Sequence, residues 1–220
     1  MRSVAALLVL LAASLAAAAE PDVYLTLDAT LDPTPGFVPE AAPRRLVMLE
    51  DGTVYVGGSR HVAVGHLDKT QLRDLDKRFE KLRKQGVSEA VTFGPGTARY
   101  HLVVAKGKAL DVTTTGDPEA APFNLRPLAA LVSELARLDD PSLRPYAPAT
   151  YAVRATLGTL AGGCRAWDLP IPVDSAVASA QPVPAAAATG WTTGAVASSV
   201  CVNDKSYIVT LRPLLPGERP

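Results

Sequence analysis

Residues that commonly form catalytic or metal sites are scarce in this sequence of 220 residues. It contains three histidines and two cysteines, and aromatic residues make up 5% of the chain. An excess of charge of one sign is also lacking, because 22 basic side chains balance 22 acidic ones. Such a chain generates no long-range field that would attract nucleic acid or an anionic membrane surface. We therefore expect no nucleic-acid partner.

Long apolar runs are absent after the first twenty residues. Arg2 precedes the apolar run Val4–Leu15, and the small residues Ala16–Ala19 follow it. A basic residue, a short apolar run and small residues, in that order, are typical of a secretory signal peptide. The run has about 12 residues, whereas a membrane-spanning helix needs roughly 20. The sequence therefore predicts a signal peptide of residues 1–19 and export to the periplasm or the medium. Cleavage one residue earlier and an uncleaved anchor are the alternatives.

The two cysteines, Cys164 and Cys201, permit one pairing. An even number of cysteines in an exported chain indicates a disulfide, because oxidising compartments preserve it. The bridge would close a loop of 36 intervening residues and contribute about 3–4 kcal/mol to stability. The alternative is a reactive thiol. Neither cysteine lies in a Cys-x-x-Cys pattern or beside a His or Lys in sequence, so we favour the disulfide.

Residues 20–43 begin with a strand-like run and continue with closely spaced prolines. The run is Val23–Leu27, and the prolines that follow are Pro33, Pro35, Pro39 and Pro43. Proline at this density is incompatible with a helix or a central strand. We expect an extended N-terminal arm.

Residues 44–66 have the pattern of consecutive antiparallel strands. Asp51-Gly52 separates the apolar run Arg44–Glu50 from the alternating run Thr53–Val56. An Asp-Gly pair between such runs is a strong hairpin signal. With His61–Val64 as a third strand, the sequence predicts a short meander.

Residues 68–85 show the spacing of an amphipathic helix. Asp68 is placed as the N-cap and Gln71 completes a capping box, while Gly86 suits a left-handed C-cap. Charged residues of both signs occupy the opposite face, which we expect to be solvated. The apolar face carries Leu72, Leu75, Phe79 and Leu82.

A second hairpin and a second helix complete the first domain. Thr97–Ala105 and Ala109–Thr115 flank a turn, and an apolar helical pattern follows, for which Asn124 is the expected cap. We predict an α+β domain over residues 44–140, in which a meander and a hairpin form an antiparallel sheet covered on one face by both helices. The second helix presents Leu128, Leu131, Val132, Leu135 and Leu138.

The C-terminal third differs in composition, because it is rich in alanine and proline. Residues 141–149 are expected to form a linker, and residues 150–220 a small β-rich unit that contains the Cys164–Cys201 disulfide. Asn203-Asp204-Lys205 is the expected turn of a hairpin within it. We expect 212–218 to end as an extended arm.

The candidates for catalysis and metal binding are few. His61, His66 and His101 lack the spacing of a metal site, since zinc needs three or four converging ligands. His61 and His101 have the strand parity of polar neighbours and are expected to face solvent. Ser59, two residues from His61, could act as a nucleophile only with a base and an orienting group in space. We expect no metal, no cofactor and no catalytic residue.

Trp167 and Trp191 lie in stretches rich in proline and glycine. They could form a binding surface for a ligand or glycan. Equally, they could anchor a small core beside the disulfide, which we favour because a small unit depends on aromatic burial.

Several segments resemble uncharacterised bacterial exported proteins and lipoproteins. The resemblance lies in the hairpin at Asp51-Gly52-Thr53-Val54, in Pro145–Pro148, in Trp167–Pro170 and in Tyr207–Glu218, which ends in Arg-Pro-Leu-Leu-Pro-Gly-Glu. The chain departs from the lipoprotein members because it has no cysteine for lipidation near residue 19. The resemblance implies export from a bacterial cell and no particular activity.

These observations favour an exported, non-catalytic protein that binds an envelope or extracellular protein or a glycan. A secreted protease inhibitor, presenting a loop between Cys164 and Cys201, is the first alternative. A hydrolase that uses Ser59 with His61 or His101 is the second.

Overall fold

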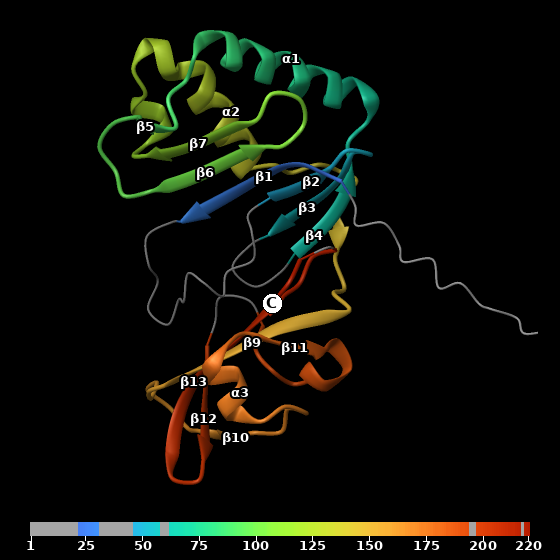
Figure 1. Ribbon diagram of the computed structural model, residues 1–220, viewed down its shortest axis with the longest axis vertical. Helices are drawn as coiled ribbons and strands as arrows, with labels where there is room; N and C mark the ends of the chain where they lie inside the picture. The colour runs from blue at the N-terminus through green and yellow to red at the C-terminus, as the bar shows by residue number, and fades with distance from the viewer. Residues whose placement is uncertain (1–21, 31–45, 58–61, 194–196, 217) are drawn as a thin grey trace, which may run out of the picture.

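The computed structural model describes residues 22–30, 46–57, 62–193, 197–216 and 218–220, which form two β-sheets in two lobes (Figure 1). The fold is therefore mixed α+β, as expected. The predicted signal peptide at 1–19, the proline cluster between 33 and 43, Ser59 and His61 lie outside these residues.

The N-terminal lobe contains an eight-stranded sheet and two helices. Its strand order is β5-β7-β6-β1-β2-β3-β4-β8, and all neighbours are antiparallel except β5 and β7. The strands are β1 (Val23–Thr30), β2 (Leu46–Leu49), β3 (Thr53–Gly57), β4 (Val62–His66), β5 (Ala90–Thr92), β6 (Arg99–Val104), β7 (Leu110–Thr115) and β8 (Arg144–Pro145).

The meander and the second hairpin are confirmed, and β1 joins them. Asp51-Gly52 forms the turn between β2 and β3, with Gly52 at a φ of 97° that favours glycine. Strand β1 is longer than the run expected at Val23–Leu27 and pairs with β2 on one side and β6 on the other. The expected arm at 20–43 therefore supplies a central strand, because β1 is apolar enough to be buried between the meander and the hairpin.

Helix α1 (Lys69–Gln85) has the predicted boundaries and caps. The Asp68 side chain accepts hydrogen bonds from the N–H groups of Thr70 and Gln71, and the Gln71 side chain accepts one from Asp68 N–H. Gly86 ends the helix in the left-handed conformation. The capping box and the left-handed C-cap are therefore both confirmed.

Helix α2 (Arg126–Ala136) buries the predicted apolar face but begins differently. The expected cap at Asn124 is wrong: Leu125 holds the N-cap position and no side chain caps the helix. A 3-10 turn, Phe123–Leu125, leads directly into α2, with Pro127 in its first turn. Both helices cover the same face of the sheet (Figure 1) and share one core with it.

The C-terminal lobe contains a five-stranded sheet in the order β10-β12-β13-β9-β11. The predicted hairpin of β12 and β13 is confirmed, and Asn203 and Asp204 at its turn both have positive φ. Its elements are β9 (Thr150–Leu157), β10 (Arg165–Ala166), α3 (Val173–Ala178), β11 (Gln181–Pro184), β12 (Ser198–Val202) and β13 (Lys205–Pro213).

The Cys164–Cys201 disulfide is present and joins the residue that precedes β10 to β12. The two Cα atoms are 5.7 Å apart, a separation typical of a disulfide. In the part of the chain that the structure describes, no helix has the length and apolar character needed to cross a membrane.

The end of the chain is not the extended arm expected at 212–218. Leu215 is 3% exposed and packs with Val47, Leu49 and Tyr55 on the face of the first sheet opposite the helices. The expected linker at 141–149 also contains structure, since β8 pairs with β4 and the Tyr146 hydroxyl donates to the carbonyl of Leu214. These contacts connect the two lobes because the apolar face of β2–β4 needs a cover on its second side.

Candidate binding groove

The two tryptophans contact each other within the C-terminal lobe. Their rings meet edge to face at a centroid distance of 5.9 Å. Trp191 is 7% exposed and belongs to the core, and Trp167 packs against that core partly buried. The geometry is that of a structural anchor.

Hydrogen bonds within the lobe already satisfy both indole N–H groups. Trp167 donates to the carbonyl of Ile171, and Trp191 donates to Asp168 Oδ1 at 2.8 Å. The Arg165 guanidinium lies 3.9 Å from the Trp191 ring centroid and pairs with Asp168. Since these polar groups satisfy one another, the pair offers a ligand few free donors.

The histidines do not converge. His66 ends β4 and His101 lies on β6, with three strands between them in the sheet. His101 is partly exposed, as its parity predicts, and its Nε2 lies 2.7 Å from Asp111 Oδ1. Among the described residues, no three His, Cys, Asp or Glu side chains are placed to hold a metal ion.

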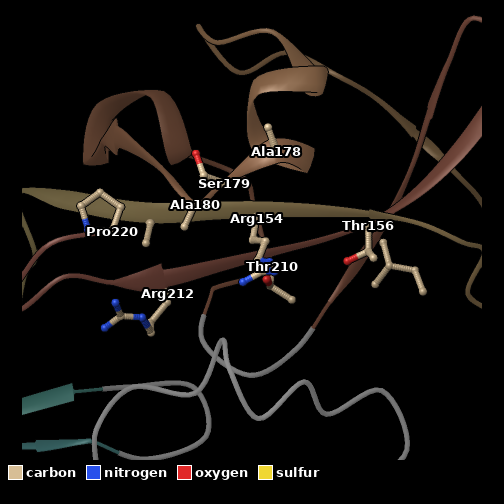
Figure 2. Close-up of a pocket in the computed structure, with 10 residues that line it drawn as sticks. Arg154, Thr156, Ala178, Ser179, Ala180, Thr210, Arg212 and Pro220 are labelled. Carbon is tan, nitrogen blue, oxygen red and sulfur yellow. The ribbon is translucent and has the colours of Figure 1, made fainter.

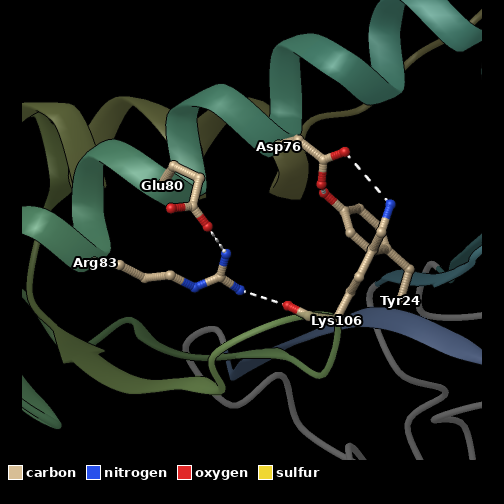
Figure 3. A network of polar contacts seen from close by, with 5 residues as sticks. All are labelled: Tyr24, Asp76, Glu80, Arg83 and Lys106. Atoms are coloured by element: carbon tan, nitrogen blue, oxygen red, sulfur yellow. Dashed lines mark hydrogen bonds and ion pairs between the residues drawn. The ribbon is translucent and has the colours of Figure 1, made fainter.

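A polar network fixes α1 on the sheet (Figure 3). Tyr24 donates to Asp76 at 2.9 Å, Lys106 lies 3.4 Å from the same carboxylate, and Arg83 donates to the carbonyl of Lys106 at 2.6 Å. Burial, with the Asp76 carboxylate as a second cause, raises the pKa of Tyr24 above its ordinary value. The network joins α1 to β1 and to the β6–β7 turn, which is a structural role.

A groove of about 600 Å³ lies on the outer face of the C-terminal sheet (Figure 2). Successive residues of a strand point to opposite faces, and one set from β9 and β13 enters the core: Val153, Ala155, Tyr207, Val209 and Leu211. The alternate set lines the groove: Ala152, Arg154, Thr156, Ile208, Thr210 and Arg212.

Strand register arranges these outward residues in pairs. Thr210 lies opposite Arg154, and Arg212 opposite Ala152. Ser179, on the segment between α3 and β11, adds a third hydroxyl at the edge. The groove therefore combines two guanidinium groups with three hydroxyls, and none of the described side chains that line it is a carboxylate.

The two arginines differ in their partners. Arg212 is largely buried and pairs with Glu218 at 2.8 Å. Arg154 is exposed, and no side chain or backbone group among the described residues pairs with its guanidinium. Among the described lining residues, Arg154 is thus a charged side chain that remains available to a ligand.

Sequence reasoning identified the strand Tyr151–Leu157 but not the groove. The alternation of Ala152, Arg154 and Thr156 with buried residues was a usable signal. The matching alternation in β13 was also visible. What the sequence could not show is that β9 and β13 are neighbours, because 47 residues separate Leu157 from Lys205.

Comparisons with known proteins do not assign a function, so the proposal has to rest on the geometry of the structure. No protein-family model, curated protein or solved structure matches the chain. The resemblance to exported proteins and lipoproteins therefore stays a prediction.

Proposed function

We propose that the protein is an exported, non-catalytic binding protein whose ligand occupies the groove on β9 and β13. The observation that carries the proposal is a hollow of about 600 Å³ in which the Arg154 guanidinium pairs with no group among the described residues. Pockets that bind small molecules commonly have volumes of roughly 300–1,000 Å³ and contain a few placed polar groups. The groove meets both criteria.

Two features support export. The order of basic, apolar and small residues within 1–19 is that of a signal peptide. The Cys164–Cys201 disulfide suits an oxidising compartment, since disulfides are rare where thiols are kept reduced.

The geometry favours this proposal over a protease inhibitor. The described residues between the two cysteines include β10, α3, β11 and most of β12, and several of their apolar side chains enter the core. Inhibitors of that kind would present an exposed loop between the cysteines, and this segment instead supplies core. A hydrolase would depend on Ser59 and His61, outside the described residues, or on His101, whose described side-chain partner is Asp111.

Export is tested by intact mass of the protein recovered from the periplasm or medium of its host, with and without reductant and thiol alkylation. We expect the mass of residues 20–220 less two hydrogens, and alkylation at both cysteines only after reduction. A full-length mass, or two thiols that alkylate without reductant, contradicts the proposal.

Binding is tested by a ligand-observed NMR screen of the oxidised protein against sugars, sugar acids, amino acids and nucleotides. Ala178→Trp fills the groove, and Ala130→Trp adds the same bulk to an exposed position on α2. We expect at least one compound to lose binding in Ala178→Trp and to keep it in Ala130→Trp. A screen without such a compound contradicts the groove as the site.

A further inference from the structure

We infer that the ligand of the groove is a hydroxylated carboxylic acid of sugar-acid type, whose carboxylate pairs with Arg154. This inference rests on the proposed function, because it names the chemistry of the same site. It follows from the charged side chains, the hydroxyls and the small apolar residues of the groove.

The charged side chains of the groove favour a ligand with a single negative charge. Glu218 neutralises Arg212 in an ion pair in which both side chains are less than one fifth exposed. Arg154 is therefore a positive side chain of the groove that no carboxylate side chain among the described residues balances. A single carboxylate balances this charge, whereas a dianionic phosphate would leave a negative charge in the groove.

The shape of the cation favours a carboxylate as well. A guanidinium is planar and presents parallel N–H donors that match the two oxygens of a carboxylate. Arg154 is exposed and has no described partner to hold it in another orientation. It can therefore turn both donors toward one ligand.

The remaining lining residues suit a ligand with several hydroxyl groups. Thr156 carries an exposed hydroxyl that can both donate and accept. Ser179 Oγ accepts from Gln181 Nε2 at 2.7 Å and can still donate, and Thr210 is 5% exposed. Ala152, Ala178 and Ala180 take up little space, so they allow a ring to lie close to the sheet. A sugar acid supplies the carboxylate, the hydroxyls and the compact ring together.

The test compares three sugars that differ only at carbon 6: galacturonate, galactose and galactose 6-phosphate. Their dissociation constants are measured by titration calorimetry or NMR on the oxidised protein. We expect galacturonate to bind most tightly. The dissociation constant of galactose should be higher by about tenfold or more, because galactose cannot form the charge-assisted hydrogen bonds. Added salt is expected to weaken the binding of galacturonate more than the binding of galactose.

Variants assign the effect to one residue. We expect Arg154→Gln to weaken the binding of galacturonate about tenfold or more and to leave the binding of galactose unchanged. Arg154→Lys should give an intermediate loss, since the charge remains and the paired donors do not. Arg99→Gln, at an exposed arginine on β6 of the other lobe, should change nothing.

Other results overturn the inference. These are equal binding of galactose and galacturonate, tighter binding of the phosphate, binding of galacturonate that Arg154→Gln leaves intact, or no binding of galacturonate at millimolar concentration. If the wider screen meanwhile finds a neutral compound that Ala178→Trp excludes, the inference fails and the proposed function stands. If no compound responds to Ala178→Trp, both fail.

Discussion

Tyr24 is a single residue through which the stability of the folded protein depends on pH. Its side chain is 2% exposed and its hydroxyl donates to Asp76 on α1. Ionisation would place a second negative charge beside that carboxylate, in a buried position. The folded protein therefore holds the Tyr24 proton more tightly than the unfolded chain does, and its pKa is raised.

We predict that the free energy of unfolding falls as the pH rises above about 10, the ordinary pKa of tyrosine. The unfolded chain loses the Tyr24 proton there while the folded protein keeps it, so ionisation favours unfolding. Tyr24→Phe should make this fall shallower, with a residual slope from Tyr55 and Tyr146, whose pKa values burial also raises. Urea unfolding from neutral to alkaline pH measures how the free energy of unfolding depends on pH. Identical slopes of this free energy against pH for variant and wild type would contradict the prediction.

At the scale of elements, α1 was predictable because its signals are local. The side chain of Asp68 reaches N–H groups only two and three residues away. Leu75, Phe79 and Leu82 bury one face whatever the helix packs against. A sequence therefore contains all that is needed to set both ends of such a helix.

Loss of this cap should be measurable. We expect Asp68→Ala to lower the free energy of unfolding by about 1 kcal/mol, because two N–H groups at the start of α1 lose their acceptor. Lys69→Ala, at the next exposed position, is the control and should change stability by less than about 0.5 kcal/mol. Chemical denaturation compares the two, and equal stabilities would argue against the capping box.

Other elements depended on distant partners and were predicted less well. Asn124 has the chemistry of a cap, but the chain enters α2 through a 3-10 turn and Leu125 takes that position. Strand β1 was expected to belong to an arm because prolines follow it, yet it lies between β2 and β6. In both cases packing against another segment outweighed the local pattern.

At the scale of the molecule, the disulfide constrains the C-terminal lobe. We expect the double variant Cys164→Ser/Cys201→Ser to lose about 3–4 kcal/mol, because the unfolded chain regains the freedom of the closed loop. Calorimetry and limited proteolysis should show the loss in the C-terminal lobe, while the N-terminal lobe keeps its protection. Unchanged stability in the double variant would mean that the bridge adds nothing to the fold.

The packing of Leu215 on β2–β4 is a second feature that affects the stability of the whole molecule. We expect Leu215→Ala to cost about 2–5 kcal/mol and to separate the unfolding of the two lobes into distinct transitions. Leu157→Ala, at a leucine that is 64% exposed, is the matched control and should have an effect below about 0.5 kcal/mol. Similar effects of the two substitutions in calorimetry would refute the docking role.

The sequence by itself determined the α+β class, the meander, the caps of α1, the β12–β13 turn and the pairing of Cys164 with Cys201. These depend on side chains a few residues apart, or on there being only one possible partner. Only the tertiary structure decided the central place of β1, the docking of Leu215 and the groove around Arg154. Those features require segments far apart in the chain to meet, and local periodicity carries no information about which distant surface covers which.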